Sequence, residues 1–182
     1  MHTSTQLCPC QINPSAATQT SLSYSDCCQP YHNEIDKADG IKAENAERLM
    51  RTRYSAFVQV LPDYIVKTTL PAQQNLLNIQ AIETWARETD WAGLEIVKHT
   101  PKLGKRHAQV EFKAFFNDSK HTVEGLPAHH ELSTFVKVKD KANSERWYFL
   151  DPTVKMNVTQ KQPCICGSGE KFKRCCGGYL GS

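Results

Sequence analysis

All eight cysteines of this 182-residue chain lie in two short groups near its ends, in patterns typical of metal ligands. The N-terminal quartet is Cys8, Cys10, Cys27 and Cys28, and the C-terminal quartet is Cys164, Cys166, Cys175 and Cys176. A disulfide framework usually spreads its cysteines through a small secreted chain, whereas four thiols close together suit a tetrahedral Zn²⁺ ion. We therefore predict up to two structural zinc ions per chain. Each has four sulfur ligands and no open coordination position.

The C-terminal quartet has the more specific pattern. Its first pair is followed by Gly167-Ser168-Gly169, and its second pair follows an aromatic residue, Phe172, within a basic run. Because glycine tolerates positive φ, this turn can bring the two pairs around one ion, and Phe172 can cover the site. Free or disulfide-paired thiols are the alternative interpretation.

The N-terminal quartet repeats this pattern with a longer loop. Sixteen residues separate its pairs, where eight separate those of the C-terminal quartet, and Tyr24 takes the place of Phe172. The Gly-Ser-Gly turn is missing. Doubling a loop adds only about 0.6 kcal/mol to the cost of closing it, so we still expect zinc here. A disulfide or an unfilled site is the alternative.

Between the quartets, the apolar pattern changes from a helical period to a strand period. Apolar spacings of three and four predict helices over 43–69 and 76–89, and Pro62 suits the first turn of a second short helix over 62–69. Apolar alternation predicts four strands, over 94–100, 107–117, 129–139 and 146–151. Helices followed by an antiparallel meander predict an α+β domain with one face of its sheet covered.

Several polar residues in this middle region could belong to a site. They are Arg51, Arg53 and Tyr54 on the first helix, His130, Glu131 and Ser133 on the third strand, and Asp151 at the end of the sheet. Strand alternation places His130 on the opposite face from Glu131 and Ser133, so the three cannot line one cavity. Histidines at 107, 121, 129 and 130 lack the spacing of a further metal site.

A purely structural interpretation of these polar residues is favoured. In it, Arg51 or Arg53 pairs with Glu131 at the seam between helix and sheet. Tyr54 lies at the tip of a core helix, and His130 is a half-buried, hydrogen-bonded histidine. We therefore assign no catalytic residue.

Charge and hydropathy narrow the class of protein. Lys and Arg number 22 and Asp and Glu 19, but eight metal-bound thiolates and two divalent ions would change the formal charge from +3 to about −1. This argues against a polyanion partner, although the basic run 171–174 keeps nucleic acid or ribosome contact as a weaker interpretation. No run reaches the roughly 18 apolar residues of a membrane helix, and Met1 to Gln6 lack a basic segment leading into an apolar one. We expect a cytoplasmic protein without membrane insertion.

Residues 164–176 resemble the SEC-C motif, the zinc-binding tail of the SecA preprotein translocase. In this resemblance all four cysteines of the C-terminal quartet are zinc ligands, and the module contacts other macromolecules. The whole chain is similar to the YchJ family of bacterial proteins, which carry a nuclear transport factor 2-like (cystatin-like) cone between SEC-C-like ends. The matching stretches are 27–32, 49–57, 130–135 and 146–149. The chain departs from the family at its enlarged first cysteine loop and at Leu150-Asp151-Pro152, where a tighter Asp-Gly turn is expected.

The resemblance implies three parts and one favoured function. The parts are an N-terminal SEC-C-like zinc knuckle with its linker over 1–39, the cone domain over 40–157, and a C-terminal SEC-C zinc knuckle over 158–182. The implied function is a protein-interaction adaptor whose knuckles contact another protein, in a role linked to translation or secretion.

Two other functions stay open. The first is a pocket in the cone that binds a small molecule or acts as an enzyme, isomerase- or hydrolase-like. That the protein is an enzyme is the less favoured interpretation. The enzyme requires a deep pocket with a carboxyl or imidazole group of shifted pKa, whereas the adaptor requires exposed, rigid knuckles and a filled or featureless cone. The second is a thiol redox sensor, which would contain no zinc.

Overall fold

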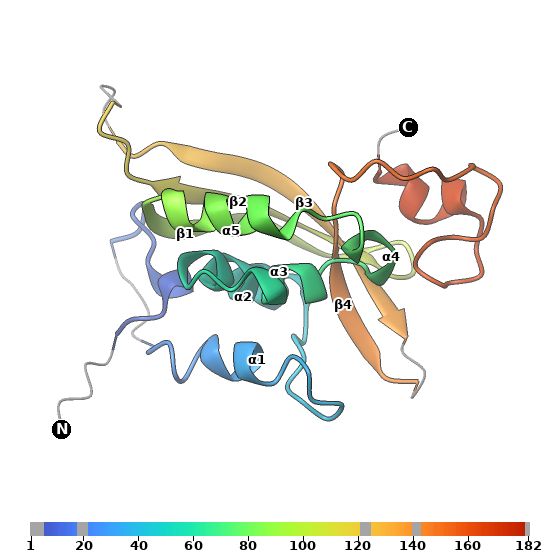
Figure 1. Cartoon of the computed structure of the whole chain (residues 1–182), viewed down its shortest axis with the longest axis horizontal. Helices are drawn as coiled ribbons and strands as arrows, with labels where there is room; N and C mark the ends of the chain where they lie inside the picture. The colour runs from blue at the N-terminus through green and yellow to red at the C-terminus, as the bar shows by residue number, and fades with distance from the viewer. Residues whose placement is uncertain (1–5, 18–21, 121–124, 140–142, 181–182) are drawn as a thin grey trace.

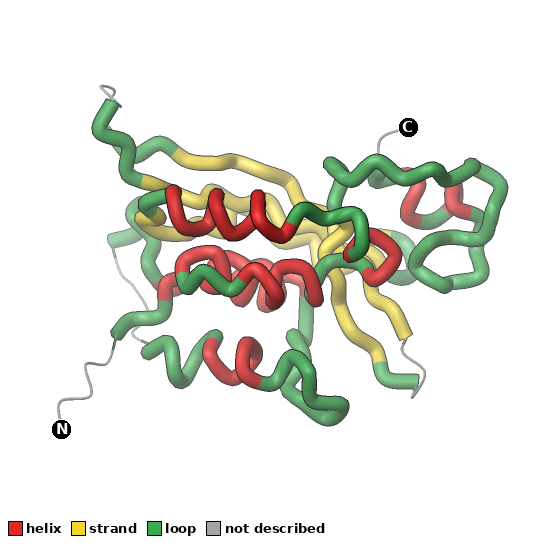
Figure 2. Tube along the Cα trace, in the orientation of Figure 1, coloured by secondary structure: helices red, strands yellow, loops and turns green. Residues whose placement is uncertain are grey.

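The computed structural model describes residues 6–17, 22–120, 125–139 and 143–180. Residues 1–5, within the N-terminal segment expected to lack a leader, and His121 lie outside the described residues. A curved sheet has helices along one face, and the C-terminal segment packs at one end of it (Figures 1 and 2). Among the described residues, no helix is long and apolar enough to cross a membrane.

The helices follow the expected pattern with two additions. They are α1 (Gln29–Asn33), α2 (Ala46–Val58), α3 (Pro62–Lys67), α4 (Pro71–Gln74) and α5 (Ile79–Glu88). The side chain of Asn45 caps α2 by accepting a hydrogen bond from the Arg48 amide, and Asn78 caps α5 in the same way. Pro62 begins α3, as expected. The short helices α1 and α4 were not predicted.

The sheet is the predicted antiparallel meander. Its strands are β1 (Trp91–Leu103), β2 (His107–Phe116), β3 (Ala128–Lys139) and β4 (Glu145–Leu150), hydrogen-bonded in the order β1-β2-β3-β4. The β2–β3 register places Phe112 beside Glu131 and Ala114 beside His129. These side chains therefore share one face of the sheet, the face that the helices cover.

Each face of the sheet has its own apolar core. On the helix side, Leu49 and Tyr54 of α2 pack with Val110 and Phe135 and with the whole N-terminal quartet. On the opposite side, Val136 packs with the C-terminal quartet and with Leu70, Leu150, Phe172 and Leu180. The two cysteine quartets are therefore buried against the cone domain, on opposite sides of the sheet.

Candidate metal centres and the cone pocket

The sulfur atoms of the N-terminal quartet have the spacing of a tetrahedral metal site. Cys10 Sγ lies 3.6 Å from each of the sulfurs of Cys8, Cys27 and Cys28. Ligands about 2.3 Å from a tetrahedral Zn²⁺ lie about 3.8 Å apart, whereas a disulfide brings two sulfurs to about 2.05 Å. All four cysteines are free and buried. The geometry therefore fits a metal ion and not a disulfide.

The C-terminal quartet has the same geometry. Cys166 and Cys175 hold their sulfurs 3.5 Å apart, and all four ligand atoms lie within 4.8 Å of one another. Gly167 and Gly169 have φ of 75° and 78°, so the Gly-Ser-Gly turn adopts the left-handed backbone that glycine favours. Four sulfurs around each centre also leave no position for substrate, which suits structural zinc.

The two quartets share one local design. In the N-terminal knuckle, the Cys8 amide donates to the Leu22 carbonyl and the Tyr24 amide to the Gln6 carbonyl. In the C-terminal knuckle, the equivalent pairs are Cys164 with Glu170 and Phe172 with Gln162. Tyr24 and Phe172 therefore occupy equivalent positions, which confirms the alignment expected from the sequence.

The enlarged first loop closes against the cone. The Leu94 amide of β1 donates to the Ile12 carbonyl over 2.7 Å. Gly93, with φ of +149°, lies so close to this loop that a Cβ there would be 2.5 Å from Pro14 Cδ. Packing on β1 thus replaces the missing Gly-Ser-Gly turn.

Polar groups point toward the sulfurs in both quartets. Arg48 Nη1 lies 3.5 Å from Cys27 Sγ, and Ser55 Oγ lies 3.6 Å from Cys8 Sγ. In the C-terminal quartet, the donors are the Cys176 amide to Cys164 Sγ (3.4 Å) and the Ser168 hydroxyl to Cys175 Sγ (3.5 Å), and His107 Nε2 lies 3.4 Å from Cys176 Sγ. Such contacts offset thiolate charge and orient metal ligands.

The thiols of a quartet cannot all ionise together without a cation. A hydrogen bond from Cys164, then one from Cys176, lowers the pKa of Cys166. Hydrogen bonds to Cys164 and then Cys166, with burial, raise the pKa of Cys176. Burial, before any other cause, also raises the pKa of Cys175, so thiols of the quartet keep their protons at neutral pH, and a divalent ion bound there would displace them.

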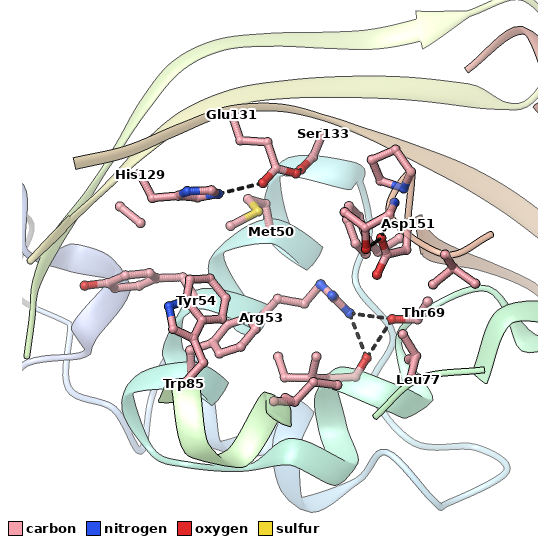
Figure 3. A pocket seen from close by; sticks show the side chains of 18 of the residues that line it. Met50, Arg53, Tyr54, Thr69, Leu77, Trp85, His129, Glu131, Ser133 and Asp151 are labelled. Carbon is pink, nitrogen blue, oxygen red and sulfur yellow. Dashed lines mark hydrogen bonds and ion pairs between the residues drawn. The ribbon is translucent and has the colours of Figure 1, made fainter. Parts of the chain in front are cut away.

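The cone contains a cavity of about 750 Å³ between α2, α5 and the sheet, open to solvent on one side (Figure 3). Its walls are largely apolar and include six aromatic side chains, those of Tyr54, Phe57, Trp85, Trp91, Phe112 and Phe149. Trp85 packs edge-on against Phe57 and Trp91, with ring centroids 4.9 and 5.3 Å apart. The cone is therefore neither filled nor featureless.

The structure divides the polar residues singled out from the sequence. Five of them line the cavity: Arg53, Tyr54, Glu131, Ser133 and Asp151. Arg51 instead donates to the Cys10 carbonyl and to Glu47, and supports the N-terminal quartet. His130 is exposed and lies 2.8 Å from Glu111, so its expected half-burial is wrong.

The expected pairing of Arg51 or Arg53 with Glu131 is also wrong. Glu131 Oε2 contacts His129 Nε2 over 2.8 Å, and its Oε1 accepts a 2.6 Å hydrogen bond from Ser133. His129, which the sequence raised only as a possible metal ligand, lines the cavity. Strand alternation could have found it, because His129 shares a face with Glu131 and Ser133.

The sequence matches three family profiles in chain order. They are the N-terminal zinc binding domain of the YchJ family over residues 2–35, the YchJ middle NTF2-like domain over 45–152, and the SEC-C motif over 161–178. A UPF0225 protein of Actinobacillus succinogenes is 46% identical over 178 residues, which cover 97% of this chain and 99% of that one. A UPF0225 protein of Haemophilus influenzae is 48% identical over 95% of this chain and 93% of its own.

Two solved structures are also similar. A SEC-C motif containing protein from Psychrobacter arcticus is 70% identical, with a TM-score of 0.90 over 96% of this chain and 97% of that one. A SEC-C motif containing protein from Rhodopseudomonas palustris, solved in solution, is 29% identical, with a TM-score of 0.59 over 80% of this chain and 96% of its own. These matches and the two cysteine quartets agree: the chain belongs to the YchJ family, with an NTF2-like cone between two centres that fit zinc.

Proposed function

We propose that this protein binds a small, largely apolar molecule in its cone, and that zinc at the two cysteine quartets fixes the ends of the chain onto that cone. The observation that carries this proposal is the largely apolar cavity of about 750 Å³, with six aromatic side chains in its walls. Ligand pockets are typically apolar clefts of about 300–1,000 Å³ with a few polar groups inside. Thiol ligands also persist best in a reducing compartment, which supports a cytoplasmic location.

In this proposal the metal centres have a structural role. All eight cysteines serve as zinc ligands, four in each quartet. The N-terminal quartet packs against α2, and the C-terminal quartet packs against the outer face of the sheet. Each therefore holds an element of the cone in place and takes no part in ligand chemistry.

A neutral apolar dye tests ligand binding. N-Phenyl-1-naphthylamine gains fluorescence in apolar surroundings, and we expect it to titrate to one site per chain. The double variant Ala114→Phe/Ser133→Leu enlarges two side chains that line the cavity and should abolish this binding. Lys113→Phe adds an aromatic ring at the neighbouring outward-facing position and should not. Equal binding by the filled variant, or no saturable binding by the wild type, would contradict the proposal.

Protein docking by the C-terminal knuckle is a second candidate function. One observation favours it: Lys171, Lys173 and Arg174 are exposed beside the buried C-terminal quartet, so a rigid site presents three basic side chains. The partner would carry an acidic surface. Affinity capture from lysate with the wild type and with Lys173→Glu/Arg174→Glu tests this function. A partner that docks on the knuckle should be captured by the wild type and lost with the variant. Partners captured equally by both do not depend on the knuckle.

A further inference from the structure

Among the described residues, Arg53 is the one arginine whose side chain is buried, and this side chain lines the cavity. Only 6% of the residue is exposed. Its Nη1 donates to the Ile65 carbonyl (2.9 Å), the Thr68 hydroxyl (2.7 Å) and the Thr69 hydroxyl (3.3 Å), and its guanidinium lies 4.4 Å from the centre of the Phe149 ring. All of these partners are neutral.

This buried cation forms no ion pair in the part of the chain that the structure describes, although, against the larger lowering of its pKa by burial, Asp151 and Glu131 are near enough to raise that pKa. No described carboxylate oxygen lies within ion-pair distance of the guanidinium, and no described residue accepts a hydrogen bond from Nε or Nη2. Figure 3 shows Nη1 held on the Thr69 side, while the rest of the group lies toward the middle of the pocket. Burial lowers the pKa of Arg53 to about 10, so the group still carries its charge at neutral pH.

The two carboxylates that line the cavity have partners of their own. Glu131 is paired with His129 and accepts from Ser133. Asp151 Oδ1 accepts from the amide and the hydroxyl of Thr153, over 2.8 and 2.6 Å. Because buried charges are usually paired, and neither carboxylate contacts the guanidinium directly, the Nε and Nη2 donors at the cavity wall are suited to an acid from outside the chain.

We propose that the ligand is an apolar monocarboxylic acid, whose carboxylate accepts hydrogen bonds from Nε and Nη2 of Arg53 and whose apolar or aromatic body packs among Trp85, Trp91 and Phe112. This inference rests on the proposed function. Arginine presents a planar fork of donors that matches a carboxylate in two parallel hydrogen bonds. A second negative charge on the ligand is disfavoured, because Glu131 and Asp151 line the same cavity.

The experiment uses a matched pair of competitors against N-phenyl-1-naphthylamine bound to the wild type. The competitors are 1-naphthylacetate and 1-naphthylacetamide, which share a ring system and differ in charge. A charge-assisted hydrogen bond contributes about 1.5–3 kcal/mol, so we expect the acid to displace the dye at a concentration at least about tenfold lower than the amide. Equal displacement by both, a better amide, or displacement by neither overturns the inference. If the dye itself does not bind, the proposed function has failed.

Two variants test whether Arg53 is the group that makes the cavity prefer the acid over the amide. Arg53→Gln should remove the preference for the acid, because it removes the charge from the cavity wall. Arg87→Gln removes an arginine from the exposed face of α5, where it pairs with Glu83, and should leave the preference intact. A preference that survives Arg53→Gln places the recognition elsewhere and contradicts the assignment. If Arg53→Gln does not fold, the wild-type comparison still decides, and Arg53→Lys should keep part of the preference.

Discussion

His107 Nε2 lies 3.4 Å from the sulfur of Cys176, which connects the first residue of β2 to the C-terminal quartet. The His107 ring also packs on Tyr179, with ring centroids 4.5 Å apart. The sheet therefore contributes both a polar and an aromatic contact to the knuckle. A metal ligand and a strand of the cone hold each other in position, although they are 69 positions apart in sequence.

Replacing His107 should weaken metal binding at the C-terminal quartet alone. His107→Phe keeps a ring against Tyr179 but removes the nitrogen that faces Cys176, and loss of such an outer partner typically costs about 10–100-fold in metal affinity. We expect one of the two bound zinc ions to become about tenfold easier to remove in a chelator titration. His130→Phe changes an exposed histidine on β3 and serves as the control. Equal release of both ions would contradict a local role for His107.

Gly93 should be needed for the N-terminal knuckle to dock. A Cβ at Gly93 would lie 2.5 Å from Pro14 Cδ and 2.7 Å from the Ile12 carbonyl oxygen. Gly93→Ala should therefore displace the enlarged loop and lower the free energy of unfolding by about 2 kcal/mol more than Gly104→Ala. Gly104 is a matched control, because its φ is +57° but nothing lies within 4 Å of its Cβ position. Urea unfolding of both variants measures the difference, and similar losses would show that the close approach is unimportant.

The sequence predicted the metal centres better than the pocket, because ligand spacing is a local property. The cysteine pairs, and the match of Tyr24 to Phe172, depend on short-range turns that can be read along the chain. The pairing of Glu131 was within reach of the same reasoning, because His129 lies two residues before it on β3 and so on the same face. What the pattern along the chain does not show is that Arg53 is held by Ile65, Thr68 and Thr69 and does not pair with Glu131.

The cavity was not predictable from periodicity. Alternation assigns Phe112, Ala114 and Ser133 to the covered face of the sheet, but it does not say how completely the helices fill the space above them. That depends on where α5 crosses the sheet, which follows from the connection through α4 after Leu70. The short helix α4 has no apolar period of its own, and only Pro71 at its start is a local signal.

Stability should decrease in mild acid because of His32. This side chain is buried, and its Nε2 donates to the Thr52 carbonyl (2.9 Å). In the neutral ring, Nδ1 accepts from the Tyr24 hydroxyl (2.7 Å). Burial lowers the pKa of His32 below its ordinary 6.5. Below pH 6.5 the unfolded chain therefore binds a proton that the folded chain excludes, and the free energy of unfolding falls by up to about 1.4 kcal/mol per pH unit until the folded pKa is passed.

Thermal unfolding between pH 7.5 and 5.5 measures this dependence, with zinc content followed in the same samples because acid also protonates thiol ligands. His32→Gln should be less stable at neutral pH and should have a flatter profile than the wild type. His130→Gln alters an exposed histidine and should keep the wild-type slope. If the slope in His32→Gln equals that of the wild type, the dependence comes from other groups.

Val60 is strained, and relieving it should stabilise the protein. It has φ of 55°, in the left-handed region that β-branched residues avoid. The backbone there is a regular helix stop: the Val60 amide donates to Phe57 O (3.1 Å) and the Leu61 amide to Ala56 O (2.9 Å), a geometry in which Gly or Asn is usual at the position of Val60. Val60→Asn should raise the free energy of unfolding by about 0.5–1 kcal/mol, because left-handed backbone costs an ordinary residue about 1–2 kcal/mol and asparagine less.

Val58→Asn, within the last turn of α2, is the control and should destabilise the protein, since Val58 packs against the core with right-handed backbone. Urea unfolding of the two variants separates backbone strain from side-chain packing, and a loss of stability in Val60→Asn would mean that the contacts of the valine side chain outweigh its strain.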